Sequence, residues 1–130
     1  MFVVIDNTVE GEIIFNYLLN NKIVQARFAG KDAESGIIFC LNGLLKTVKK
    51  KIKELEAVAV FVGSGRYTAS RLSATVANTL AFALEIPVVA VERGSDMKKI
   101  FEKIKKKKAG KYIIPKYSGE ANIGKKNLSK

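Results

Sequence analysis

The stretch LEAVAVFVGSGRYTASR, residues 55–71, decides the fold. Its first part, from Ala57 to Val62, is an unbroken apolar run that ends at Gly63-Ser64-Gly65, and a helical pattern follows from about Thr68 to Leu84. A short apolar run without alternation is typical of a parallel strand that is buried on both faces of its sheet. The stretch therefore predicts a strand–turn–helix unit of an α/β protein, with its strand in the interior of the sheet.

The glycine turn of this unit indicates, by itself, only a weak phosphate site. Glycines let a backbone approach a ligand closely, and the free N–H groups at a helix N-terminus attract anions. However, Thr68 stands at the third glycine position of G-x-G-x-x-G, and no Gly-Lys-Ser/Thr follows as in a Walker loop. On the glycines alone, a plain strand-to-helix turn is the favoured interpretation.

The residues before this unit predict a meander of three strands. Apolar or alternating runs cover residues 2–5, 13–19 and 23–28. Asn20-Asn21 separates the last two runs, and Asn tolerates the positive φ that a type I′ hairpin turn requires. Residues 30–34 are then expected to form a loop.

Two further helices are predicted on either side of the unit. Ser35 is expected to cap the first, whose apolar stripe consists of Ile38, Leu41, Leu45, Val48 and Ile52, widened by Ile37 and Leu44. Ser95 is expected to cap the last, whose apolar face consists of Met97, Ile100, Phe101 and Ile104.

The order of elements predicts the fold class. Between the last two helices, residues 88–91 form another apolar run, residues 112–114 could add a short final strand, and residues 118–130 are polar. Three antiparallel strands followed by right-handed strand–helix crossovers give a mixed five-stranded sheet flanked by helices. This is the α/β arrangement of a ribonuclease-H-like or actin-like lobe. We expect one domain over residues 1–117 and a basic tail over 118–130.

The composition excludes several classes of chemistry. The chain has no histidine and one cysteine, which excludes catalytic triads, Cys-His dyads and metal sites built on histidine. No apolar run approaches the roughly 18 residues of a membrane span, and the N-terminus lacks the features of a secretory leader. A lone cysteine suits a reducing compartment. We expect a cytoplasmic protein without a metal or a cofactor of its own.

Positive charge is concentrated near the C-terminus. The net charge is +11, and residues 95–130 hold twelve lysines against Asp96, Glu102 and Glu120. Lysines that neutralise phosphates release counterions from nucleic acid, so a segment of this kind could contact tRNA. The same lysines could equally serve solubility, because the segment has no arginine and few aromatic residues.

The turn and its surroundings resemble the TsaB family. In that family a strand ending in Gly-Pro-Gly is followed by Ser-Phe-Thr-Gly-Leu-Arg, a helix rich in small residues and a strand that opens with Ile-Pro. The matching positions here are Gly63, Gly65, Tyr67, Thr68 and Arg71, followed by Ile86-Pro87, while Ile5–Thr8 is similar to the family's first hairpin and Ser35 to its His-Ser. Ser64, Arg66 and Ala69 depart from the pattern. The resemblance spans about residues 1–93.

This resemblance implies a non-catalytic role in making threonylcarbamoyladenosine in tRNA. A TsaB protein pairs with a TsaD-like protein, or with itself as a homodimer, through its first two helices. The catalytic relative TsaD relies on a histidine-ligated metal, which this chain cannot supply. The expected contact residues are those of the first helix and of the small-residue stripe on the second: Ile37, Leu41, Leu44, Ser70, Ser73, Ala74, Ala77 and Ala81.

The resemblance also implies at most half of a nucleotide site. Actin-like proteins hold nucleotide between two lobes, and TsaB proteins usually have a second lobe, so ATP or ADP is expected only at an interface with a partner. The residues that would contribute are Asp6, Thr8, Gly63, Gly65 and Thr68. Asp6 would orient a metal-bound water in an active member, but a hairpin-capping role is the favoured interpretation.

Two alternatives remain open from the sequence. One is a small basic RNA- or DNA-binding protein on a ribonuclease-H-like scaffold, for which binding should weaken steeply with salt. The other is a residual nuclease or ATPase, which would need clustered carboxylates for two metal ions. Only Asp6, with Glu10 and Glu12 in the following hairpin, approaches that requirement, so the second alternative is disfavoured.

Overall fold

The described part of the chain contains a mixed five-stranded sheet. The computed structural model describes residues 1–62, 67–92 and 94–114, of which residues 67–70 by their backbone alone. In it the strands lie in the order β3-β2-β1-β4-β5, with β1, β4 and β5 parallel and β2 antiparallel to both β1 and β3. Their bounds are β1 Phe2–Asp6, β2 Glu12–Leu19, β3 Lys22–Ala29, β4 Ala57–Val62 and β5 Val88–Glu92. The predicted sheet is confirmed, and β4 is an interior strand between β1 and β5.

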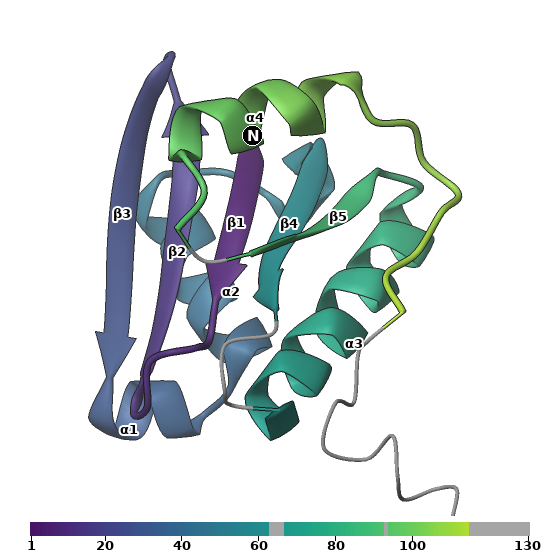
Figure 1. The fold of residues 1–130 in the computed structure, drawn as a ribbon. Coiled ribbons are helices and arrows are strands. Elements are labelled where there is room, and N and C mark those ends of the chain that lie inside the picture. The colour runs from purple at the N-terminus through teal and green to yellow at the C-terminus, as the bar shows by residue number, and fades with distance from the viewer. Residues whose placement is uncertain (63–66, 93, 115–130) are drawn as a thin grey trace, which may run out of the picture.

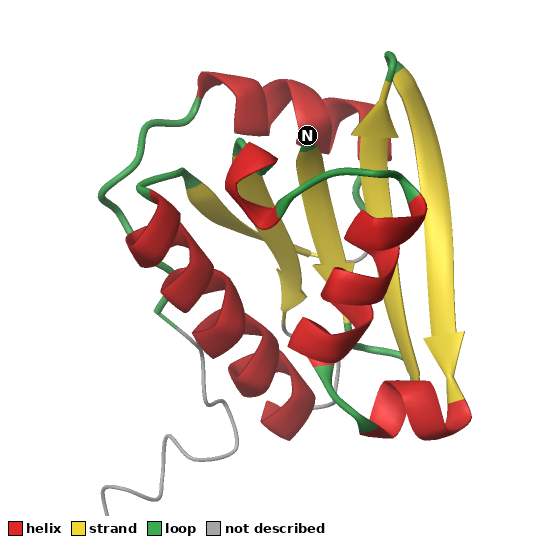
Figure 2. Ribbon diagram, turned by 180° about the vertical axis from the view of Figure 1, so that it is seen from behind, coloured by secondary structure: helices red, strands yellow, loops and turns green. Residues whose placement is uncertain are grey.

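Helices cover both faces of this sheet (Figure 1). Seen from behind, three helices lie in front of the strands, α1, α2 and α3, while α4 covers the opposite face (Figure 2). Their bounds are α1 Gly30–Glu34, α2 Ile37–Thr47, α3 Tyr67–Leu84 and α4 Met97–Lys106, with a short 3-10 helix, η1, at Ile52–Glu54. The described elements therefore form three layers, helix–sheet–helix.

The two faces of β4 explain its unbroken apolar run. Val58 and Val60 pack into the core beneath α2 and α3. Ala57, Ala59 and Phe61 pack into the separate core beneath α4. Because both faces are covered, alternation with polar residues would bury unsatisfied polar groups, so the strand is apolar throughout.

The β2–β3 hairpin has the expected turn. Asn20 and Asn21 have φ angles of 53° and 64°, the left-handed values that a type I′ turn needs at both central positions. Beneath the hairpin, the rings of Phe15 and Phe28 meet edge to face with centroids 5.8 Å apart. The local turn and the core contact thus fix the same register.

Residues 30–34 form α1, so the predicted loop is wrong. Gly30 and Gly36 have φ angles of +60° and +102°, which let the chain turn sharply at either end of this five-residue helix. The predicted cap at Ser35 is also wrong. Its hydroxyl donates to the Lys31 carbonyl at 3.0 Å, and Gly36 is the residue that precedes α2.

The first long helix is shorter than predicted, and its stripe is rotated. Helix α2 ends at Thr47 in a Schellman motif, in which the Lys50 N–H donates to the Leu45 carbonyl at 2.8 Å and Lys49 takes a φ of 58°. Ile38 and Ile52 are exposed. The side chains that α2 buries are Ile37, Cys40, Leu41, Leu44 and Leu45.

Helix α4 keeps its predicted face but not its predicted cap. Ile100, Phe101 and Ile104 are buried against the sheet. The Asp96 carboxylate accepts a hydrogen bond from the Lys98 N–H at 3.0 Å, while the Ser95 hydroxyl donates to the Glu92 carbonyl. Asp96 is therefore the cap of α4.

The segment after α4 is held by a side chain rather than by a strand. Residues 112–114 do not pair with the sheet, so the predicted final strand is wrong. Instead, the Asn78 amide of α3 donates to the Ile113 carbonyl and accepts from the Ile113 N–H, both at 2.8 Å. This pair of bonds fastens the segment alongside α3 (Figure 1).

Candidate functional site

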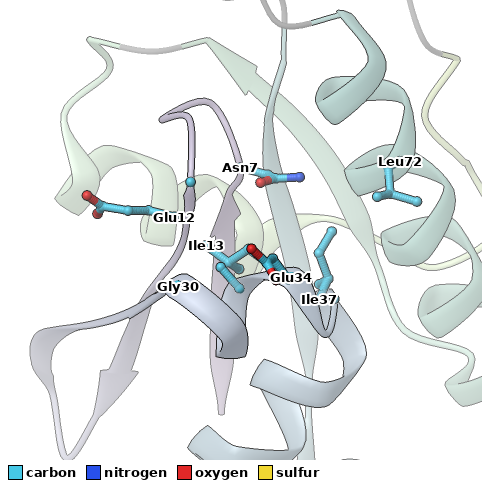
Figure 3. A pocket seen from close by; sticks show the side chains of 10 residues that line it. Asn7, Glu12, Ile13, Gly30, Glu34, Ile37 and Leu72 are labelled. Carbon is cyan, nitrogen blue, oxygen red and sulfur yellow. The ribbon is translucent and has the colours of Figure 1, made fainter.

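A pocket opens beyond the carboxyl end of β1. Its volume is about 420 Å³, within the range of small-molecule sites. Figure 3 shows Asn7 and Leu72 on either side of the opening, with Glu34 and Ile37 between them and below. The lining comes from the β1–β2 turn, β2, α1, α2 and α3: Asn7, Gly11, Glu12, Ile13, Gly30, Ala33, Glu34, Gly36, Ile37 and Leu72.

The described lining of this pocket is acidic. It includes the carboxylates of Glu12 and Glu34 and no lysine or arginine side chain. Glu12 is already engaged, because its Oε1 accepts from the Arg27 guanidinium at 2.7 Å. A nucleotide phosphate placed here would meet like charge, so a bound phosphate would need positive charge from a metal ion or from another molecule.

Asp6 and Thr8 lie together but do not line the pocket. Both are buried, and Oδ1 of Asp6 accepts from the Thr8 N–H at 2.9 Å and from the Thr8 hydroxyl. This is the geometry of an Asp that caps its own turn. Of the other predicted nucleotide residues, Gly63 and Gly65 lie outside the described residues, as does the side chain of Thr68.

The predicted contact residues lie in the protein's own core, which corrects the expected surface. On α2, Ile37, Leu41 and Leu44 are at most 3% exposed. On α3 the small-residue stripe faces inward, because small side chains let this helix lie close to β4. Its buried members are Ser73, Ala74, Ala77 and Ala81. The side chain of Ser70 lies outside the described part.

The outward faces of the same two helices carry large apolar side chains. Ile38 and Phe39 on α2 are 42% and 54% exposed, and Leu72 and Phe82 on α3 are 51% and 72% exposed. We call these four residues the outer apolar surface. The sequence contains one sign of it, because apolar residues occur nearly all round the second helix, a pattern that indicates burial on more than one side.

The single cysteine is not built as a nucleophile. Cys40 is fully buried on α2, and its thiol donates to the Asp32 carbonyl at 3.2 Å. Burial, together with the nearby negative charge of Asp32, raises the pKa of the thiol above its ordinary value. The thiol therefore stays protonated at neutral pH, whereas a reactive cysteine needs a lowered pKa.

Neither a cluster of metal-ligating side chains nor a membrane-spanning helix occurs among the described residues. No group of three or more cysteine, aspartate or glutamate side chains there is arranged to hold a metal ion. None of the described helices has both the length and the apolar character needed to cross a membrane.

Comparison with known proteins identifies the family. Residues 12–97 match the family model described as TsaD: tRNA N6-adenosine threonylcarbamoyltransferase. A curated relative is the tRNA threonylcarbamoyladenosine biosynthesis protein TsaB of Buchnera aphidicola (subspecies Acyrthosiphon pisum, strain APS). It is 33% identical over 72 residues, which are 55% of this chain and 33% of the relative.

Solved structures show the same fold. YeaZ from Pseudomonas aeruginosa superposes with a TM-score of 0.61 at 22% identity, over 70% of this chain and 44% of that one. A second structure, described as similar to the peptidase YeaZ from Pseudomonas aeruginosa, gives the same score and identity and has 42% of its length covered. These likenesses establish the ribonuclease-H-like or actin-like α/β lobe that the sequence predicts.

The share of each protein that is covered determines which conclusion each match supports. This chain spans about a third of the length of the curated relative and less than half of each solved structure. The family model, in contrast, covers more than half of this chain, from β2 to the start of α4. The chain belongs to the family of that model, and it is similar in sequence to a TsaB protein and in fold to YeaZ.

Proposed function

We propose that this chain is a non-catalytic partner protein in the biosynthesis of threonylcarbamoyladenosine in tRNA. The similar TsaB protein of Buchnera aphidicola is named as a protein of this biosynthesis. The absence of histidine from the sequence argues against the catalytic role of a histidine-ligated metal enzyme. In this role the chain contributes a binding surface, and the chemistry belongs to the protein that it binds.

The observation that carries the proposal is the outer apolar surface of α2 and α3. Ile38, Phe39, Leu72 and Phe82 project from two helices that lie side by side on one face of the sheet (Figure 2). Exposed large apolar side chains on neighbouring helices are typical of protein interfaces, and aromatic residues contribute most to such contacts. We propose that a TsaD-like protein covers this surface, and that a second copy covers it when that protein is absent.

The same arrangement explains how nucleotide could still be involved. Leu72 belongs both to the outer apolar surface and to the lining of the pocket. A protein seated on α3 would therefore also lie over the pocket and could bring basic groups to it. In this proposal the isolated chain binds no cofactor, and ATP or ADP binds only at the interface with a partner.

The test is to place a charge on the outer apolar surface. Phe39→Glu and Leu72→Glu should each leave the circular dichroism spectrum unchanged, because these side chains reach water in the free chain. At an interface the new carboxylate would be buried without a partner, which costs several kcal/mol, or about a hundredfold or more in affinity. Association with a TsaD-like protein from the same organism, measured by calorimetry, should be lost.

A matched control lies on the edge strand β3. Ile23 is 44% exposed, comparable with Ile38, but stands on a strand remote from α3. Ile23→Glu should associate like the unmodified chain. If Phe39→Glu and Leu72→Glu also associate normally, the outer apolar surface is not the interface and the proposal is wrong.

A further inference from the structure

Lysines from two distant segments lie at one end of the sheet, where β1 and β4 begin. One group follows α2, and the other ends α4. Figure 1 shows α4 lying across this end beside the point marked N, and Figure 2 shows the connection from α2 to β4 passing the same point on the opposite face. We call these residues the basic end: Lys49, Lys50, Lys51 and Lys53 after α2, and Lys105, Lys106, Lys107 and Lys108 of α4 and the residues after it.

The two groups border the same hollow. Lys50 and Lys105 line one hollow of about 260 Å³, together with Phe2 and the hairpin tip at Asn20 and Asn21. The connection that carries the first group is fixed to the start of the chain, because the Met1 amine donates to the Glu54 carbonyl at 3.1 Å. The sheet therefore sets the distance between the groups, although more than fifty positions separate them in sequence.

Most of this positive charge is not neutralised within the protein. The Glu56 carboxylate pairs with the amine of Met1 rather than with a lysine. The Glu54 carboxylate accepts a hydrogen bond from the Lys51 backbone N–H and lies 3.9 Å from the Lys50 ammonium. The other lysines of the basic end make no ion pair within the described residues, and their side chains are exposed. Such a concentration of like charge is unfavourable in the free protein and favours an anionic partner.

We propose that the basic end binds the phosphate backbone of RNA without reading its sequence. Lysine is a flexible point charge that neutralises phosphates, whereas base recognition depends on arginine, asparagine or glutamine placed in a groove. Asn20 and Asn21, exposed at the hairpin tip, add amide donors suited to phosphate and sugar oxygens. The choice of RNA among polyanions rests on the proposed function, since that process modifies tRNA.

The proposal differs from a basic tail that binds RNA alone. It assigns half of the surface to Lys49–Lys53, which belong to the body of the fold and precede the lysine-rich C-terminal segment by more than forty positions. A surface held by the sheet keeps its lysines at fixed separations, so both groups must contribute to binding together. Removing either one should weaken the interaction.

The experiment measures the salt dependence of RNA binding by the full chain. A fluorescently labelled tRNA transcript is titrated from about 50 to 300 mM salt, and the slope of log K against log salt is compared between variants. Lys51→Gln with Lys53→Gln, and separately Lys105→Gln with Lys106→Gln, should each reduce the magnitude of the slope by about 1 to 2. A transcript of unrelated sequence should give the same affinities.

The control removes the same charge elsewhere. Lys31→Gln with Lys111→Gln takes one lysine from α1 and one from beyond the basic end. This pair should leave the slope nearly unchanged. An equal effect of the control would mean that net charge alone drives binding. An effect of the Lys105 pair without one of the Lys51 pair would mean that the α4 lysines act alone. Tighter binding to phosphatidylserine vesicles than to RNA would assign a different partner, and each of these results overturns the proposal.

The experiments distinguish failure of the RNA-binding proposal from failure of the proposed function. The basic-end variants should associate normally with a TsaD-like protein, because they leave the outer apolar surface intact. Normal association without RNA binding would reject the basic end alone. RNA binding by the basic end together with normal association of Phe39→Glu would reject the scaffold interface and leave the basic end standing.

Discussion

The two ends of the sheet differ in charge. The end where β1 and β4 begin is surrounded by exposed lysines, whereas the pocket beyond the end of β1 is lined by Glu12 and Glu34. In open α/β sheets, ligands usually bind beyond the carboxyl ends of the strands. Here that end offers a hollow of about 420 Å³ without basic side chains among its described lining, and the opposite end offers a hollow of about 260 Å³ whose lining includes Lys50 and Lys105. In the proposals above, a small ligand and a polyanion therefore use opposite ends of one sheet.

The largest expected effect tests the packing of α3 on the sheet that joins the two ends. Ala77 is completely buried between α3 and the sheet. Ala77→Glu should therefore unfold the chain, because an unpaired buried carboxylate costs several kcal/mol out of a typical total of about 5–15 kcal/mol. Phe82→Glu changes a 72% exposed position of the same helix and should stay folded. Thermal unfolding followed by circular dichroism distinguishes them, and a folded Ala77→Glu would show that α3 packs differently.

The second prediction separates the position of charge from its amount. Glu10→Lys and Glu34→Lys add positive charge near the pocket, at the far end of the sheet from the basic end. Added to Lys51→Gln with Lys53→Gln, they more than restore the net charge. RNA binding should nevertheless keep the reduced salt slope, lower by about 1 to 2, because phosphates bind where the remaining lysines converge. Recovery of the original slope would mean that the amount of positive charge, and not its position at one end of the sheet, governs RNA binding.

The third prediction concerns the segment that leads away from the basic end along α3. Asn78→Ala removes both hydrogen bonds to Ile113 and leaves the partly buried Ile113 backbone without these partners, at a cost of about 1–3 kcal/mol. Hydrogen exchange at Ile113 should become faster while α3 stays protected. Asn78→Asp retains the acceptor for the Ile113 N–H and should give an intermediate rate. Unchanged exchange in Asn78→Ala would mean that other contacts hold the segment.

The smallest effect on function is expected at Asp6. Asp6→Ala removes the acceptor of the Thr8 backbone and hydroxyl bonds, which should lower stability by about 1–3 kcal/mol because both donors are buried. We expect no metal-dependent hydrolysis of ATP or RNA by the unmodified chain, and so no activity for this variant to lose. Turnover that disappears in Asp6→Ala would instead give the pocket end a catalytic role.

The sequence was sufficient for the sheet because each of its signals is local. The apolar run of β4, the Asn20-Asn21 turn and the alternation of β3 each depend on neighbouring residues. The helix ends were harder to predict. Helices α2 and α3 both stop with a non-glycine residue in the left-handed region, Lys49 and Glu85, where glycine would have been the usual signal.

The functional surfaces could be predicted less well, because they depend on contacts between distant residues. A helix that is apolar nearly all round does not reveal which side faces the sheet, so the sequence alone leaves Ala77 open to a partner or to the sheet, and the structure shows it packed inward. The Asn78–Ile113 bonds join positions 35 residues apart. The basic end is likewise visible only after the sheet has brought Lys50 and Lys105 to the lining of one hollow.

The buried thiol of Cys40 gives the chain a built-in probe of local opening. It is the only cysteine in the sequence and is fully enclosed under α2. A thiol reagent can modify it only during moments when the structure around it opens at α1 or α2, and the raised pKa of the thiol slows the reaction further. The modification rate at fixed pH therefore reports how often this part of the structure opens. A protein seated on the outside of α2 should slow that rate, so its binding could be followed without introducing any label.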